Sequence, residues 1–349
     1  MTLANERQGV DVTDGEALSR GANPGRDRRT VCIAVLASLA ATSLSARAAT
    51  PRRVAWVSID SPNPSNQSLK NWRVAMRELG WVEGQNLVID LWWAEGSAEK
   101  LKALVPQILA RNPEVIVATT GPAVRPFVDG QVAAPVVFAF SADPVQGKVV
   151  NSWARPGVNR TGVSYFSLEL VPKRMQLIKE MLPRTQRLAV VGWPPHAGEL
   201  LELDAARQAA QQQGLTLEYW GAHTGAEVDA ALGAIDGWKA DAVLVFAGVV
   251  ASSHADRFAA WSLRRRVPTV GAWAPFAEAG NLMAYGPVIT EAQARLAVFV
   301  DRILKGAKAS EIPVELPARI EMVLNLKTAR AIGVEIPRSV LQRADRVIE

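Results

Sequence analysis

Small polar residues follow apolar, strand-like segments at three places in the first half of the chain. They are Ser58, Asp60 and Ser61 at the first place, Thr120 and Gly121 at the second, and Ser141 and Asp143 at the third. In open α/β sheets a ligand lies outside the carboxyl ends of the strands, so these are candidate ligand-binding residues. Each hydroxyl taken alone is more readily explained by helix N-capping, and only the clustering on one predicted edge points to a ligand.

The turn at Thr120-Gly121-Pro122 adds a charge preference to this edge. It leads into a predicted helix, whose free backbone N–H groups and positive dipole end favour a carboxylate. Few basic residues follow the predicted strands. The pattern therefore predicts a ligand held by neutral donors rather than by an arginine clamp.

Aromatic residues follow the strand-like segments of the second half. The set is Trp193, Trp220, Trp273 and Phe276, with Tyr285 on a later, predicted return crossover. Aromatic rings stack on planar or apolar ligand bodies, and an indole N–H can also donate. The chain contains 11 Trp, most of which must be packing residues. We select Trp193, Trp273 and Tyr285 as the predicted ligand contacts of this half.

Patterns that would indicate catalysis or metal binding are missing. The sequence has no GxSxG nucleophile elbow, no GxxxxGK[ST] phosphate loop and no GxGxxG after its first predicted strand. His196 and His223 are two of only three histidines, and no HExxH-like spacing occurs. We expect no enzyme activity, no cofactor and no metal. An acid–base set of Asp60, Glu95 and Asp143 is the competing interpretation.

The charge does not indicate a nucleic-acid partner. The pI is near 9.5, but the formal net charge is only +5 on 349 residues. Basic and acidic residues alternate, as in Lys70, Arg73, Arg77 and Glu78, so no basic stripe forms. This composition predicts an ordinary mixed surface.

Strand-like and helical patterns alternate along the chain after about residue 52. In the first part the predicted strands are residues 53–59, 86–91, 115–119 and 136–139, with helices at about 67–79 and 98–110. Comparable strands recur at 187–192, 214–219, 240–245 and 267–270, at offsets of 127–134 residues and in the same order. Alternation predicts doubly wound parallel sheets, and the recurrence predicts two lobes of like topology. We expect the joint between them in residues 135–162, with Arg155-Pro156-Gly157 as the flexible crossover.

The N-terminus has the pattern of a secretory signal peptide. Arg26-Asp27-Arg28-Arg29 precedes an apolar run over 31–44, and Ala46-Arg47-Ala48 supplies small residues for cleavage after Ala48. The run is short of the roughly 20 residues that span a bilayer, so an uncleaved anchor is the weaker alternative. Cys32, the only cysteine, falls inside this segment and outside any lipoprotein acylation pattern. We expect a periplasmic protein that is not lipid-anchored.

Several motifs of the mature chain together resemble one known family. They include Leu79-Gly-Trp-Val-Glu-Gly-Gln-Asn86, Trp93-Ala-Glu-Gly96, Ala142-Asp-Pro-Val145, Ala154-Arg-Pro-Gly157, Met283-Ala-Tyr-Gly-Pro287 and Asn325-Leu-Lys-Thr-Ala329. Over roughly residues 52–349 the chain resembles the extracytoplasmic solute-binding proteins of ABC importers, in the group with tryptophan- and tyrosine-linked members. The resemblance implies a type I periplasmic-binding fold, with a hinge that the chain crosses three times. The chain departs from the family's motifs at two places. The turn before Asp143-Pro144-Val145, usually made of small residues, is Phe140-Ser141-Ala142 here, and Trp193 follows the first predicted strand of the second lobe. Both differences concern the identity of the ligand.

The resemblance and the residues together give the expected organisation. Residues 1–48 form the signal peptide, 49–155 with about 285–310 the first lobe, and 156–284 with about 311–349 the second. The C-terminal lobe assignment is left open. We expect a monomer that binds an amino acid or related organic acid in the interlobe cleft and delivers it to ABC permease transmembrane subunits. Two alternatives are an extracytoplasmic enzyme that acts on a small acid in the same cleft and a sensor subunit that presents its ligand to a membrane kinase. The sequence does not identify the ligand.

Overall fold

The structure is a computed structural model that describes residues 50–62, 66–194 and 198–349 of the chain. The predicted signal peptide, residues 1–48, lies outside the described residues.

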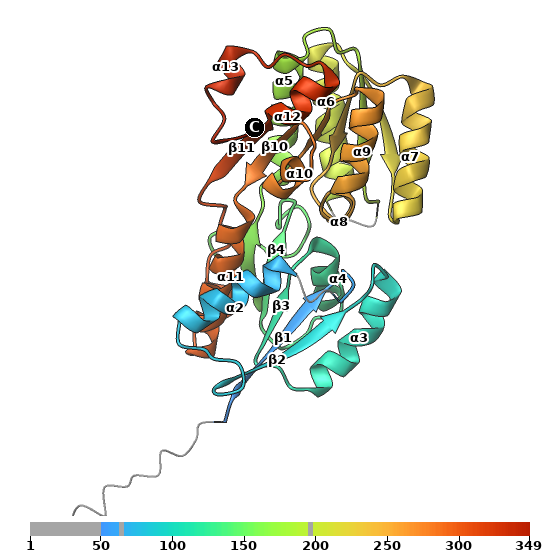
Figure 1. Ribbon diagram of the computed structural model, residues 1–349. Helices are drawn as coiled ribbons and strands as arrows, with labels where there is room; N and C mark the ends of the chain where they lie inside the picture. The colour runs from blue at the N-terminus through green and yellow to red at the C-terminus, as the bar shows by residue number, and fades with distance from the viewer. Residues whose placement is uncertain (1–49, 63–65, 195–197) are drawn as a thin grey trace, which may run out of the picture. The chain divides into compact units, whose positions relative to one another are not determined.

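The first lobe is built on a five-stranded parallel sheet in the order β2-β1-β3-β4-β5. Its strands are β1 (Arg52–Ser58), β2 (Leu87–Trp93), β3 (Val115–Ala118), β4 (Val136–Phe140) and β5 (Arg160–Ser164). Helices α3 (Ala98–Ala110) and α4 (Gly121–Asp129) cover one face, and α2 (Gln67–Glu78) and α11 (Ile289–Leu304) cover the other (Figure 1).

Alternate residues of β1 enter two separate apolar clusters. Ala55 and Val57 pack with side chains of α3 and α4, whereas Val54 and Trp56 pack with those of α2 and α11. Because both faces are covered, the strand is apolar at every position from Val54 to Val57, which explains its continuous run in the sequence.

The second lobe is built on a seven-stranded sheet in the order β12-β11-β10-β9-β8-β6-β7. Its strands are β6 (Arg187–Gly192), β7 (Thr216–Gly221), β8 (Ala242–Val245), β9 (Thr269–Gly271), β10 (Met283–Pro287), β11 (Ile320–Asn325) and β12 (Arg346–Ile348). Only β10 and β11 pair antiparallel. Leu188 and Val190 pack toward α5 (Ser167–Met181) and α6 (Glu199–Gln213), and Ala189 and Val191 pack toward α7 (Gly225–Trp238) and α9 (Ala255–Arg265).

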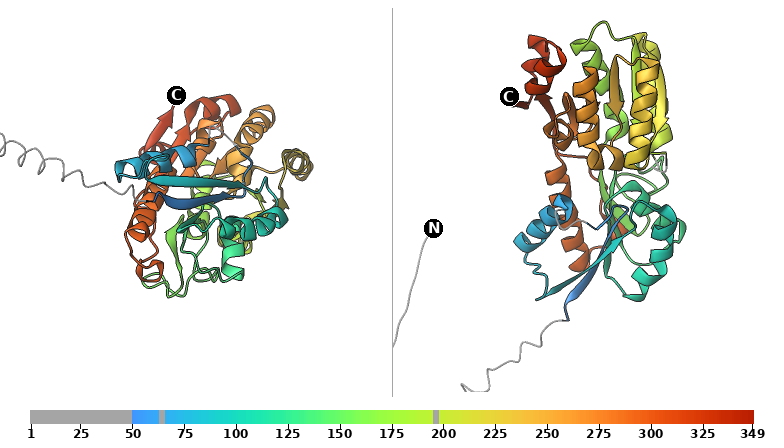
Figure 2. Two further views of the ribbon diagram at one scale, coloured as in Figure 1. Left: turned by 90° about the horizontal axis from the view of Figure 1, so that it is seen from below. Right: turned by 45° about the vertical axis from the view of Figure 1, so that its right-hand side comes forward.

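Short helices complete both lobes. They are α8 (Val249–Ser253), α10 (Ala274–Glu278), α12 (Leu326–Ile332), α13 (Arg338–Leu341) and a 3-10 turn at Ala309–Glu311. The two further views in Figure 2 show the same layering, with helices on both faces of each sheet.

The repeat seen in the sequence is a repeat of topology. The order β2-β1-β3-β4-β5 of the first lobe recurs as β7-β6-β8-β9-β10 in the second, in the pairs that the offsets predicted. The predicted fold class, two similar doubly wound α/β lobes, is confirmed. The antiparallel β11 and the terminal β12 extend only the second sheet.

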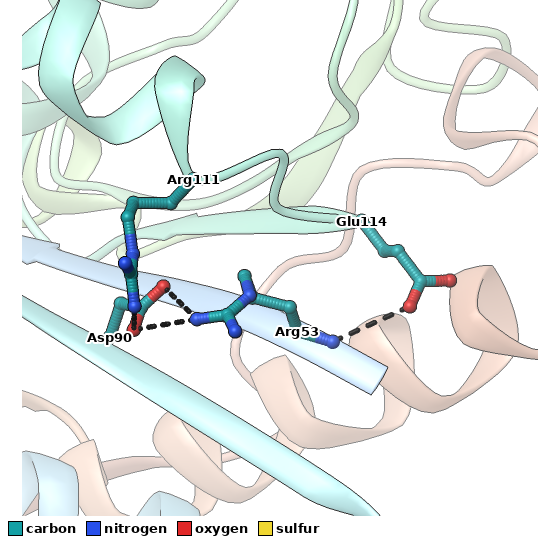
Figure 3. A network of polar contacts seen from close by, with 4 residues as sticks. All are labelled: Arg53, Asp90, Arg111 and Glu114. Atoms are coloured by element: carbon teal, nitrogen blue, oxygen red, sulfur yellow. Dashed lines mark hydrogen bonds and ion pairs between the residues drawn. The ribbon is translucent and has the colours of Figure 1, made fainter. Parts of the chain in front are cut away.

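Ion pairs hold the amino ends of the first lobe's strands, away from the candidate ligand residues. Arg53 donates through Nη1 to both carboxylate oxygens of Asp90, at 2.9 and 2.8 Å, and Nη2 of Arg111 lies 3.6 Å from Oδ1 (Figure 3). The backbone N–H of Arg53 donates to Glu114 at 3.4 Å. A surface groove of about 990 Å³, lined in part by Arg52 and Glu114, lies at this same edge. The groove is therefore not at the carboxyl ends of the strands.

The chain crosses between the lobes three times. It leaves the first lobe after β5, returns between β10 and α11, and leaves again between Ala309–Glu311 and β11. The third crossing lies against the first, because Glu315 donates its N–H to Gly162 and accepts one from Ser164, both at 3.0 Å. The second and third crossings are joined by the N–H of Val288, which donates to the carbonyl of Arg319 at 3.2 Å.

The predicted joint in residues 135–162 is wrong, because this stretch lies inside the first lobe. It contains β4, a loop and β5, which pairs parallel with β4. The Arg155-Pro156-Gly157 segment is anchored there, since the N–H of Asn151 donates to Pro156 at 3.0 Å and that of Gly157 to Ser310 at 3.2 Å. Strand β5 reads Arg-Thr-Gly-Val-Ser and has no continuous apolar run, which is why the sequence pattern did not reveal it.

The lobe boundaries accordingly differ from the expected ones. Residues 156–164, expected in the second lobe, belong to the first, where 160–164 form β5, and residues 285–287, expected in the first lobe, belong to β10 of the second. The reason in both cases is the added fifth strand of each parallel set, which the four-strand repeat did not include.

Gly286 provides a test of how tightly β9 and β10 approach each other. A Cβ at this position would lie 2.0 Å from the carbonyl oxygen of Ala272, a backbone atom that cannot move alone. We expect Gly286→Ala to lower the free energy of unfolding by about 1–3 kcal/mol or more, measured by urea denaturation. Gly233→Ala is the matched control: it lies in α7 with nothing within 4 Å, so it should stabilise by about 0.5–1 kcal/mol. Equal effects of the two substitutions would contradict the packing.

Candidate functional site

Ser58 and Asp60 form one unit at the carboxyl end of β1. The Ser58 hydroxyl donates to Oδ2 of Asp60 at 2.8 Å, and the N–H of Asp60 donates back to the Ser58 oxygen at 3.2 Å. Burial raises the pKa of the Asp60 carboxyl, and the Ser58 hydrogen bond opposes part of this rise. Because Ser58 is almost fully buried and already bonded, Asp60 is the member of the pair with capacity left for a ligand. Ser61 is exposed beyond it.

Thr120 and Gly121 follow β3 and begin helix α4. Thr120 occupies the N-cap position, but its side chain makes no capping hydrogen bond. Its Oγ1 atom is buried and has no partner. Buried hydroxyls are usually hydrogen-bonded, so this one, beside the free N–H groups of a helix start, is suited to receive a ligand.

Ser141 and Asp143 follow β4, and both have structural roles there. The carbonyl of Ser141 accepts the N–H of Ser167 at 2.9 Å, which ties this turn to the first crossing. Oδ1 of Asp143 accepts the N–H groups of Val145 at 2.7 Å and Gln146 at 2.9 Å. Asp143 therefore caps its own turn.

Trp193 and Trp273 have different surroundings. Trp193 is 3% exposed, and its indole N–H donates to Nδ1 of His223. Trp273 precedes α10 and meets Tyr165, a residue of the first crossing, edge to face at 5.8 Å between ring centroids. The Trp273 Nε1 atom is buried and has no partner. Trp273 therefore resembles Thr120 as an unpaired donor at a strand end, whereas the Trp193 donor is occupied.

Tyr285 was expected on a crossover, and this is wrong: it lies within β10. Its side chain packs against the cluster formed by α5 and α6, and its carbonyl oxygen accepts Nε of Arg174 at 2.7 Å. The crossover begins only after Pro287.

A buried charged cluster of the second lobe was not apparent from the sequence. It consists of Arg174 on α5 with Glu199 and Glu202 on α6, each at most 2% exposed. Both Nη atoms of Arg174 and both carboxyl oxygens of Glu202 have no hydrogen-bond partner. Burial raises the pKa of Glu202 well above its ordinary value, and the nearby Glu199 carboxyl raises it further. Burial lowers the pKa of Arg174 to about 10.

Glu199 is the best-connected member of this cluster. It accepts the hydroxyl of Tyr219 at 2.8 Å and a backbone hydrogen bond from Trp193. Burial raises its pKa to about 7 despite both bonds. One signal in the sequence could have revealed it: Glu199, Glu202 and Ala206 follow the spacing of the buried stripe of α6.

The described residues contain no metal centre, and none of their helices is long and apolar enough to cross a bilayer. No group of three or more His, Cys, Asp or Glu side chains there could hold a metal ion. His196 lies outside the described residues.

The fold and the strand-end residues define a two-lobed binding protein of the α/β type. The comparisons specify the class: residues 57–348 match the family described as ABC transporter substrate binding protein, and the chain belongs to this family of extracytoplasmic proteins.

Individual relatives are more distant. The chain is 20% identical over 271 residues to a "Tyrosine-binding protein" of Clostridioides difficile (strain R20291), covering 77% of each protein. A conserved domain protein from Vibrio cholerae is 26% identical with a TM-score of 0.79, covering 85% of this chain and all of that one. The ABC domain in complex with L-Trp from Streptococcus pneumonia is 23% identical with a TM-score of 0.78, covering 86% of this chain and all of that one. The matched family is described as substrate-binding, the Clostridioides difficile relative is named as a binding protein, and the Streptococcus structure is a complex with L-Trp.

The raised pKa of Glu199 predicts how stability depends on pH. The folded protein holds this proton up to about pH 7, whereas an unfolded Glu releases it near pH 4.3–4.5. The contribution to stability is therefore complete below about pH 4.5 and is lost as the pH rises to about 7, by up to roughly 3 kcal/mol. Glu199→Gln should show a smaller decline over this range, measured by urea denaturation at several pH values. Glu218→Gln, at an exposed carboxyl of β7, is the control, and a Glu199→Gln curve parallel to wild type would contradict the assignment.

Proposed function

We propose that the protein binds a small amino acid or related organic acid between its two lobes and delivers it to an ABC permease. The observation that carries this proposal is a pair of unused donors, Thr120 Oγ1 after β3 and Trp273 Nε1 after β9, one from each lobe. Other indole N–H groups also have no partner, such as those of Trp56, Trp72 and Trp92, but these residues lie within β1, α2 and β2. Trp273 is partly buried against the first lobe's apolar cluster. Thr120 and Trp273 differ from the others because each lies beyond the last residue of a strand, where ligands bind in open α/β sheets.

The chemistry of the first lobe fits the two ends of an amino acid. The start of α4, with Thr120 and Gly121, offers free N–H groups and a positive dipole end to a carboxylate. Asp60 offers a carboxylate to an ammonium group, whose charge would offset the burial that raises the Asp60 pKa. The "Tyrosine-binding protein" relative and the solved L-Trp complex make L-tyrosine and L-tryptophan the first ligands to test.

An extracytoplasmic enzyme in the same place is the competing function. Asp60 and Glu199 are acids of raised pKa at or near the strand ends, which enzymes also use. We favour binding without catalysis because the family is one of binding proteins and the sequence has no nucleophile motif. Mass spectrometry after incubation with each amino acid separates the two functions: a binding protein returns the compound unchanged.

The proposed ligand contacts predict the effect of two substitutions. Thr120→Val replaces the hydroxyl with a methyl group of similar size, and Trp273→Phe removes the indole N–H together with part of the ring. One neutral hydrogen bond contributes about 0.5–1.5 kcal/mol, so each change should weaken affinity by roughly two- to tenfold, measured by calorimetry with L-tryptophan and L-tyrosine. Trp72→Phe is the matched control, because it removes an equally unpaired indole N–H from the core of the first lobe. Unchanged affinity in both cleft variants, with the wild-type protein binding either ligand, would show that the site lies elsewhere.

The route out of the cytoplasm is also a proposal. We infer that residues 1–48 are removed as a signal peptide and that the mature protein acts as a periplasmic monomer without a lipid anchor. Ala46 and Ala48 supply the small residues required before the cleavage point.

Processing can be measured directly. N-terminal sequencing of protein recovered from the periplasm should give Ala49 as the first residue. A chain that still begins at Met1, or that begins beyond Val54, would contradict the assigned signal peptide. Replacing Ala48 with a bulky residue should leave the precursor uncut, whereas Ala49→Ser should not.

A further inference from the structure

The edges of the two sheets that lie away from the crossings meet at one point. The first crossing follows β5, the second joins β10 to α11, and the third leads into β11. Strands β2 and β7 form the edges of the two sheets on the opposite side. A rotation about the crossings moves these far edges more than any other part of the sheets. Contacts between the loops after β2 and after β7 therefore depend most strongly on how far the lobes are closed.

The first lobe presents Gly96 at this point. Three consecutive N–H groups of its loop are bonded to the end of β1: Ala94 to Ser58 at 3.0 Å, Glu95 to Asp60 at 3.1 Å and Gly96 to Ile59 at 2.6 Å. Gly96 has a φ of +80°, which an L side chain rarely adopts. The loop is thus firmly attached to the strand that carries Ser58 and Asp60.

The second lobe presents His223 against Gly96. A Cβ built on Gly96 would lie 3.4 Å from Nε2 and 3.9 Å from Cε1 of His223, which is ordinary van der Waals contact. His223 is held from two sides: its Nδ1 accepts the indole N–H of Trp193, and its backbone N–H donates to Glu227 at 2.6 Å. The imidazole and indole rings lie 5.3 Å apart between centroids, tilted by 31°.

We propose that Trp193 and His223 form a latch that closes on Gly96 and holds the two lobes together while a ligand is bound. Trp193 then acts as a positioning residue for His223 rather than as a ligand contact. The latch rests on the proposed function only in that the lobes must open and close. Glycine at position 96 suits the positive φ of this loop, and the backbone that it presents to the imidazole leads back to Asp60.

The latch can be tested without a ligand, because the proposed mature chain has no cysteine of its own. Spin labels on Gln107→Cys in α3 and Ala230→Cys in α7, both exposed positions, report the distance between the lobes. His223→Ala should broaden the distance distribution toward longer values. Gly96→Asn alters the same contact from the side of the first lobe. Asparagine can adopt the positive φ of this position, and the substitution leaves the Trp193–His223 hydrogen bond in place. It should therefore shift the distance distribution in the same direction. His254→Ala, at a histidine whose charged neighbours all belong to the second lobe, is the control.

A kinetic measurement separates the latch from the proposed function. With L-tryptophan as the probe, both latch variants should release it about two to three times faster than wild type, because a few van der Waals contacts are lost, with smaller changes in the association rate. If wild type binds neither L-tryptophan nor L-tyrosine, the proposed function fails for these ligands while the label distances still judge the latch. Identical distance distributions in wild type, His223→Ala and Gly96→Asn would overturn the latch whether or not a ligand binds.

Discussion

The band of hydrogen bonds among the three crossings is the constraint on which the rest of the molecule depends. Glu315 of the third crossing bonds to both Gly162 and Ser164 of β5, from which the first crossing leaves, and Val288 bonds to Arg319. These bonds tie the crossing segments to one another and to the end of the first sheet. The first lobe also needs the crossings for its own core, because α11 lies between the second and third and packs beside α2 (Figure 1). Neither lobe is built from a continuous segment of chain.

The buried charges of the second lobe connect the elements next to this band. Arg174 lies on α5, which begins at the first crossing, and bonds to the carbonyl of Tyr285 on β10, which leads into the second. Glu199 and Glu202 face the same region from α6, and the Glu199 carboxyl accepts a bond from the backbone of Trp193. An unpaired charge inside a protein is costly, so the raised pKa values of both acids follow from their burial. A proton on these acids relieves part of that cost.

The elements that the sequence predicted well are the apolar strands covered on both faces and the helices with a clear N-cap. Residues 187–192 were predicted as a strand and are β6, and residues 98–110 were predicted as a helix and are α3. Such segments are specified locally, because burial on both faces demands an unbroken apolar run and a helix is marked by its cap, here Ser97. Strand β5 was missed because it lacks the unbroken apolar run that marks such a strand. Its polar residues are satisfied by partners far away in the sequence, as where Thr161 donates to the carbonyl of Ile312 at 2.8 Å.

By itself the sequence determined two repeated α/β lobes and a set of polar and aromatic residues at the ends of their strands, since local periodicity and strand order are written into consecutive residues. It could not separate residues with a free donor from residues already engaged. Thr120 and Trp273 keep unpaired donors, whereas Asp143 caps its own turn and Trp193 donates to His223. Only the tertiary structure decided these roles, and it alone brought Arg174 beside Glu202 and Gly96 against His223. The physical reason is that a hydrogen-bond partner or a buried charge depends on which distant segments pack together, and that information is spread over the whole chain.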